Sequence, residues 1–114
     1  MLELLTTPAA VVIVSTMKAV ELIRTRIIYS EFAFAELVLW HLPEALDGST
    51  HHFKYRLAYI VRGECVFRYD NEAGKGDHWH LEGKERAYAF TTPEQLIMDF
   101  QNDIARWENE NSNS

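Results

Sequence analysis

Two histidines flank a tryptophan in the segment Asp77-His78-Trp79-His80, and this spacing is the most suggestive chemical feature of the chain. In an extended segment, side chains two positions apart point the same way, so the two imidazoles would share a face. Imidazoles arranged in this way can transfer protons near neutral pH or bind a metal ion. The alternative is that both histidines are loop residues that make ordinary hydrogen bonds.

A metal site would need a third and a fourth ligand, for which Asp70 and His52 are the nearby candidates. The spacing matches no zinc signature. We therefore predict neither a metal ion nor another cofactor. A metal-dependent enzyme that uses Asp77, His78 and His80 is kept as an alternative.

Three basic residues, Lys54, Arg56 and Arg68, form a second group, which a β-hairpin would bring together. Residues 52–61 alternate apolar and other side chains, the pattern of a half-buried strand, and residues 65–69 would return after a turn at 62–64. A three-residue turn, preferred because it separates polar from apolar residues, gives the opposed pairs Tyr59/Phe67, Leu57/Tyr69 and Val61/Cys65. The alternative, a two-residue turn, would put Arg68 and Asp70 on the apolar face. The three-residue register places Cys65 in the core. The polar face then gathers His52, Lys54, Arg56, Arg68 and Asp70.

Cations on a rigid sheet beside imidazoles suit phosphodiester chemistry, which needs a base, an acid and fixed positive charge. The candidate catalytic residues are His78, His80, Asp70 and Arg68. The candidate substrate-binding residues are His52, Lys54, Arg56, Asn71, Lys75 and Trp79, the last as a stacking platform. The alternative is a solvated face, on which Asp70 and Asn71 only shape a turn.

The remaining segments complete an α+β fold. Residues 19–42 predict two strands of one hairpin, divided by a break at 29–31. Residues 70–84 predict a loop with at most a short strand. Residues 86–90 predict an edge strand. Thr92 is the expected N-cap of a helix that starts with Pro93, and its apolar residues recur at helical spacing. We expect an antiparallel sheet of four to five strands packed by this amphipathic helix.

Composition indicates one globular domain. The chain has 114 residues, 47% of them hydrophobic, and a net charge of −6. Residues 49–80 nevertheless sum to +1 and hold four of the five histidines. A single cysteine, no apolar run of membrane-spanning length and no basic leader before residue 8 predict a cytoplasmic protein without membrane contact.

Three motifs, HHFKYRL, RYDNEAGKGDHWH and AYAFTTPEQLIMDFQNDI, resemble the TumE-like family of prokaryotic toxins. The resemblance runs from Met17 to about Ile104. It implies a small cytoplasmic toxin that is neutralised by an antitoxin, usually a helix-turn-helix DNA-binding protein. Activity against RNA or translation is an expectation by analogy. The position of Trp79 is more often basic in the family.

The resemblance also suggests domain limits. Residues 1–16 look like an N-terminal extension with a misplaced start, residues 17–108 form the domain, and residues 109–114 form a polar tail. The leading hypothesis is a metal-independent, ribonuclease-like toxin. A non-enzymatic protein-binding module is the other alternative.

Overall fold

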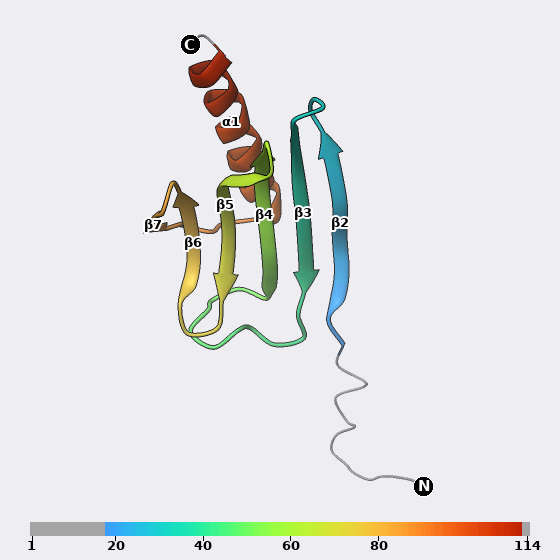
Figure 1. Cartoon of the computed structure of the whole chain (residues 1–114). Helices are drawn as coiled ribbons and strands as arrows, with labels where there is room; N and C mark the ends of the chain where they lie inside the picture. Colours follow the sequence, from blue (N-terminus) through green and yellow to red (C-terminus); the bar gives the residue numbers. More distant parts are fainter. Residues whose placement is uncertain (1–17, 113–114) are drawn as a thin grey trace, which may run out of the picture.

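The computed structural model describes residues 18–112, in which six strands form one antiparallel sheet and one helix follows. The elements are β2 (Val20–Ile28), β3 (Ala33–His41), β4 (Phe53–Val61), β5 (Glu64–Glu72), β6 (Gly76–Leu81), β7 (Lys84–Ala87) and α1 (Pro93–Ser112). Each strand pairs with its neighbours in the sequence, and α1 covers one face of the sheet, away from β2 (Figure 1). The predicted α+β class is confirmed, with six strands where four to five were expected.

The core lies between the sheet and α1. Along β3, alternate residues from Ala33 to Leu39 are buried, because a strand directs every second side chain to the same face. The helix contributes Leu96, Phe100 and Ile104, whose spacing of four residues places them on one side. The predicted helix start is confirmed, since the Thr92 hydroxyl accepts a hydrogen bond from the backbone N–H of Gln95 at 3.0 Å.

The β4–β5 hairpin has the predicted register over most of its length, with Tyr59 opposite Phe67 and Leu57 opposite Tyr69. Its turn differs from the prediction. Only Arg62 and Gly63 form the loop, with φ of 53° and 81°, the positive pair of a type I′ turn. A bulge between Tyr59 and Ile60 restores the register that a three-residue loop would have given.

The bulge moves Cys65 away from its predicted position. Cys65 pairs with Ile60 and not with Val61, so it is exposed on the face that α1 does not cover. The expectation that this thiol belongs to the core was therefore wrong.

The segment predicted as a loop from Asp70 to Lys84 is mostly sheet. β5 continues to Glu72, and β6 pairs with it over six residue pairs. The last strand, β7, is Lys84–Ala87, which precedes most of the predicted 86–90 strand. The two candidate histidines thus lie on a strand and not in a loop, which fixes the face to which each points.

At the C-terminus, α1 continues through the residues predicted as a polar tail as far as Ser112. The predicted extension at residues 1–16 lies outside the described residues. Within residues 18–112, the helix lacks an apolar stretch long enough to cross a bilayer.

Candidate functional site

The face of the sheet opposite α1, here called the open face, gathers ionisable side chains from all six described strands. Successive residues of a strand point to opposite faces, so the residues flanking Trp79 point away from the helix that Trp79 contacts. The ionisable residues on the open face include Arg24, Arg26, Glu36, Arg56, Arg68, Asp70, His78, His80 and Glu85. No other element of the described chain covers them (Figure 1).

A connected set of charges lies at the centre of this face. Asp70 accepts a hydrogen bond from Arg68 Nε at 3.0 Å, and its second oxygen lies 3.2 Å from His80 Nε2. Glu85 Oε2 lies 3.5 Å from the same His80 nitrogen. Burial lowers the pKa of Arg68, but the hydrogen bond and negative charge of Asp70 outweigh it and raise that pKa. Arg68 is therefore a permanent cation held beside the imidazole.

The two histidines of the open face differ in which nitrogen is available. His80 directs Nε2 at Asp70, while its Nδ1 makes no hydrogen bond to the residues the structure describes. The Nε2 of His78 bonds the carbonyl oxygen of Lys75 at 2.5 Å, and its Nδ1 is buried 3.3 Å from Glu85 Oε2, without hydrogen-bond geometry. Of these two histidines, only His80 therefore has an unbonded ring nitrogen that is not buried and can take part in proton transfer.

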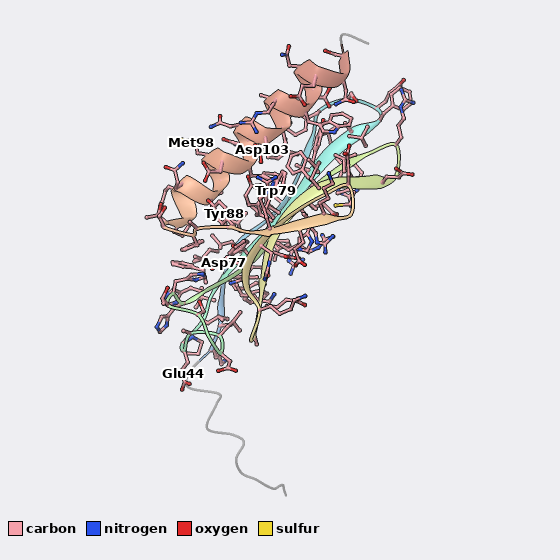
Figure 2. All side chains as sticks on the ribbon, turned by 90° about the vertical axis from the view of Figure 1, so that its left-hand side faces the viewer. Glu44, Asp77, Trp79, Tyr88, Met98 and Asp103 are labelled. Atoms are coloured by element: carbon pink, nitrogen blue, oxygen red, sulfur yellow. The ribbon has the colours of Figure 1, made fainter. Side chains whose placement is uncertain are left out.

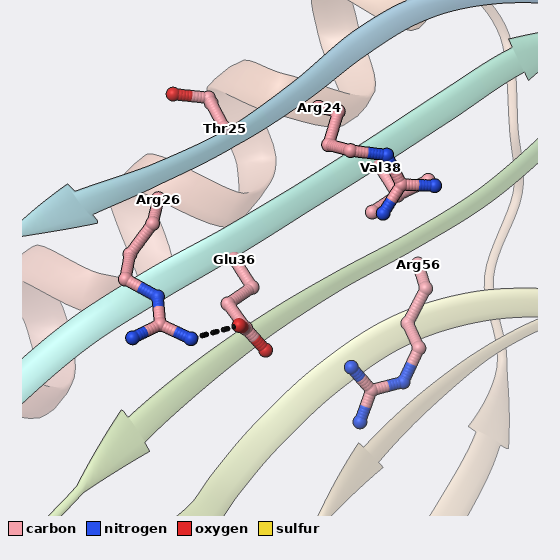
Figure 3. A pocket seen from close by; sticks show the side chains of 6 residues that line it. All are labelled: Arg24, Thr25, Arg26, Glu36, Val38 and Arg56. Atoms are coloured by element: carbon pink, nitrogen blue, oxygen red, sulfur yellow. Dashed lines mark hydrogen bonds and ion pairs between the residues drawn. The ribbon is translucent and has the colours of Figure 1, made fainter.

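A depression of about 420 Å³ extends the open face towards β2. Arg24, Arg26, Glu36 and Arg56 line it, and their side chains lie on one side of the sheet (Figure 3). Arg26 is paired with Glu36 at 2.6 Å, and Arg24 with Glu21 at 2.8 Å. The guanidinium of Arg56 makes no ion pair or hydrogen bond within residues 18–112, although its backbone lies opposite Asp70.

Sequence reasoning missed Arg24, Arg26, Glu36 and Glu85. The two arginines are spaced two residues apart within a predicted strand, which signals a shared face. The pairing of β2 with β3 was expected from the hairpin at residues 19–42. The pairings of β3 with β4 and of β6 with β7, which bring these residues to the site, were not predicted.

Three of the predicted substrate-binding residues lie apart from the central set or are engaged elsewhere. His52 stacks on His41 with ring centroids 5.9 Å apart and bonds the carbonyl oxygen of Leu42. Lys54 donates to the carbonyl oxygen of Asn71 at 2.5 Å. Lys75 is exposed at the β5–β6 turn and pairs with Glu72 at 3.6 Å.

Of the remaining predicted substrate-binding residues, Arg56 lies on the open face, whereas Asn71 and Trp79 point towards α1. Asn71 is 1% exposed, and its side chain bonds the backbone of Tyr55 and Phe53, so it joins β5 to β4. Trp79 donates its indole N–H to Asp103 at 3.1 Å (Figure 2). The structure therefore places the predicted stacking platform on the face opposite the two histidines.

Asp77 belongs to a separate cluster on the helix side. Its carboxylate accepts hydrogen bonds from Tyr55 at 2.7 Å and from His51 Nε2 at 3.0 Å. The other nitrogen of His51 accepts the backbone N–H of Phe53, so both ring nitrogens are occupied. The cluster ties the segment before β4 to β6, and sequence reasoning gave no role to His51.

The metal-dependent alternative fails on this geometry. Asp77 points towards α1 while His78 and His80 point to the open face, because neighbouring residues of a strand alternate. Across residues 18–112, no three histidine, cysteine or acidic side chains are grouped so as to hold a metal ion.

Tyrosine–carboxylate hydrogen bonds join α1 to the sheet. Tyr69 donates to Asp103, Tyr59 to Glu108, and Tyr88 to Asp99 at 2.6 Å. Burial, and then the hydrogen bond to the carboxylate, raise the pKa of each of these tyrosines. The acidic residues of α1 thus position the helix, which leaves the open face as the candidate site.

The fold and the site define a small α+β protein with an ionisable, uncovered sheet face. The family model described as Toxin TumE matches residues 3–108, and the chain belongs to this toxin family. Neither a curated protein nor a solved structure matches it. Membership in a toxin family implies an antitoxin partner in general terms.

Proposed function

We propose that this chain is a cytoplasmic toxin that acts on RNA by metal-independent phosphodiester chemistry on the open face. The observation that carries the proposal is the Asp70–His80 contact of 3.2 Å, which leaves His80 Nδ1 free on an uncovered surface. A carboxylate that holds one nitrogen of an imidazole fixes its tautomer and leaves the other nitrogen as the base. The family assignment supports a toxin but does not specify its substrate.

The proposed reaction starts at His80. Neutral His80 donates Nε2–H to Asp70, and its Nδ1 takes the proton of a ribose 2′-hydroxyl. The 2′-oxygen then bonds to phosphorus while the bond from phosphorus to the 5′-oxygen breaks. The same proton passes from the imidazolium to the leaving oxygen, which gives a 2′,3′-cyclic phosphate and a free 5′-hydroxyl. General acid–base catalysis of this kind contributes about 10²–10⁴-fold to rate.

Two arginines would stabilise the negative charge that grows on the phosphate. Arg56 has no carboxylate partner among the described residues, so it can bind a phosphate without breaking an ion pair. Arg68 is fixed by Asp70 beside the imidazole. Such preorganised donors are worth more on a rigid sheet than in water, because no reorganisation is needed during the reaction.

His78 takes a positioning role in this proposal. Its ring nitrogens face the Lys75 carbonyl and Glu85, and Glu85 also lies beside His80. His78 therefore acts on the reaction through Glu85. Lys75, exposed at the turn that leads into β6, stays a proposed contact for the RNA backbone.

Expression of the chain in bacteria tests the proposal. Growth should stop with the parent chain and continue with His80→Ala or Arg56→Ala. The controls are His41→Ala, a histidine on the other side of the sheet, and Arg62→Ala, an exposed arginine at the far turn. Both controls should remain toxic, and all four variants should keep the parent's circular dichroism spectrum. Toxicity that survives His80→Ala would refute the catalytic role.

A protein-binding function of the same face makes the opposite prediction. A binding surface loses one contact on His80→Ala and keeps most of its affinity. The proposed antitoxin, a helix-turn-helix protein encoded beside this chain, would abolish growth arrest when it is expressed together with the toxin.

A further inference from the structure

The geometry points to an acidic β-strand of the antitoxin as the occupant of the free edge of β2. We propose that this strand adds to the sheet antiparallel to β2, with its acidic side chains facing Arg24 and Arg26. The identity of the partner as an antitoxin rests on the proposed toxin function. The strand site itself rests only on the edge described below.

The hydrogen-bonding direction of β2 follows from the bonds at the ends of β3. Tyr29 N–H bonds the carbonyl oxygen of Ala33, while Arg62 N–H bonds that of Phe32. Hydrogen-bonded positions alternate along antiparallel strands, so odd-numbered residues of β3 bond to β2. In β2 the backbone N–H and C=O groups of Arg24, Arg26 and Ile28 therefore point away from β3, towards the edge of the sheet.

Within residues 18–112, this edge is long, pairs with no strand and exposes several apolar side chains beside its arginines. β2 has nine residues, and Val20, Leu22 and Ile28 are each at least half exposed. The opposite edge differs, because β7 has four residues and the sequence Lys-Glu-Arg-Ala. Short, charged edge strands discourage pairing with another chain, whereas long apolar ones invite it. As far as the described residues show, the sheet is thus open to strand addition at β2.

The positive charge along this edge favours a partner strand with acidic side chains. On the open face, the side chains of the outward-bonding residues Arg24 and Arg26 are 60% and 56% exposed. Each keeps its ion pair, with Glu21 or Glu36, and leaves its outer side accessible to a second carboxylate. On the other face, Ile23 and Ile27 offer apolar contact. A strand that alternates acidic and apolar residues would match both faces, because opposed residues of an antiparallel pair share a face.

A second copy of this chain fits less well. In the antiparallel register centred on Arg26, this residue faces Arg26 of the second copy and Arg24 faces Ile28. A shift by one pair towards the N-terminus places Arg24 opposite Arg26. Like charges directly opposite each other are destabilising. The edge therefore favours a different chain with acidic side chains.

Strand addition would also cover the depression beside the proposed catalytic centre. Arg24 and Arg26 line this depression together with Arg56 (Figure 3). Acidic side chains that reach Arg24 and Arg26 would place negative charge next to Arg56 and compete with the phosphate of RNA. One contact would thus hold the antitoxin and inhibit the toxin.

The test uses the full chain and two fluorescein-labelled nine-residue peptides, one alternating Val with Glu and one alternating Val with Lys. Fluorescence anisotropy measures binding, and amide hydrogen exchange locates it. We expect the Glu peptide to bind and to slow exchange at Arg24, Arg26 and Ile28, and the Lys peptide not to bind. The double variant Arg24→Glu/Arg26→Glu should bind the Glu peptide about tenfold more weakly or worse. The control Arg62→Glu should bind it as the parent does.

A second pair of variants tests the backbone alone. Ile28→Pro removes one outward N–H without altering either arginine, and Ile28→Thr keeps it. Ile28→Pro should weaken binding several-fold more than Ile28→Thr. The proposal would be overturned if the two Ile28 variants weakened binding equally, or if the peptide slowed amide exchange elsewhere than in β2. It would also be overturned if the chain without peptide formed a dimer in which the β2 amides were protected from exchange. His80→Ala should bind the Glu peptide as the parent does. Peptide binding at β2 would therefore stand even if the catalytic role proposed for His80 were refuted.

Discussion

Alkaline pH should unfold this protein steeply, because three buried tyrosines donate their hydroxyl protons to carboxylates. Tyr55 donates to Asp77, and Tyr59 and Tyr69 donate to carboxylates of α1. Burial and then these hydrogen bonds raise each tyrosine pKa above its ordinary value near 10. A raised pKa in the folded state gives stability that is fully present below about pH 10 and is lost as pH rises towards the folded pKa.

The size of the loss follows from linkage. A tyrosine that titrates near 10 when unfolded and well above 11 when folded lowers the free energy of unfolding by about 1.4 kcal/mol between pH 9 and pH 11. Tyr88, which donates to Asp99, has a pKa raised in the same way. Because the hydroxyls of Tyr59 and Tyr88 are less buried and contribute less, the four tyrosines together give about 4 kcal/mol. This is most of the stability of a domain whose free energy of unfolding is about 5 kcal/mol.

Urea denaturation followed by circular dichroism at several pH values measures this loss. Tyr69→Phe should reduce it by about a third, and Tyr29→Phe is the matched control, since Tyr29 is exposed and its hydroxyl bonds no described residue. The reasoning is refuted if Tyr69→Phe loses as much stability from pH 9 to pH 11 as the parent does.

Three further predictions concern single residues. Asn71→Ala should lower the free energy of unfolding by about 2–4 kcal/mol in urea denaturation, because the buried amide bonds two backbone groups of β4. Thr92→Ala should lower it by about 1 kcal/mol, which a small decrease in Tm would report. Asp70→Asn should lower kcat on RNA by about 10²-fold or more with little change in KM, because it removes the carboxylate that orients His80; a change in KM alone would contradict this role.

Local sequence signals were sufficient for the elements with strong patterns. The alternation along β4 and the Thr92-Pro93 start of α1 each depend on neighbouring residues only, and both were predicted. The segment that became β6 was not, because glycines and charges in it resemble a loop. Its strand is stabilised by distant partners, such as Asp103 of α1 for Trp79.

The candidate site was predicted in part for the same reason. The contact of Asp70 with His80 joins residues ten positions apart, across a hairpin whose pairing was not expected. Arg24 and Glu85 reach the site only through the order of all six described strands. A bulge of one residue was enough to move Cys65 to the open face.

Cleavage of RNA without metal ions tests the central claim most directly. The purified chain is incubated with a short single-stranded RNA in excess EDTA, beside the same sequence made as 2′-deoxy oligonucleotide. The account predicts RNA products that end in 2′,3′-cyclic phosphate, no cleavage of the deoxy strand, and loss of activity in His80→Ala but not in His41→Ala. An RNA left intact by a parent chain that still arrests growth, or cleavage that persists in His80→Ala, would contradict it.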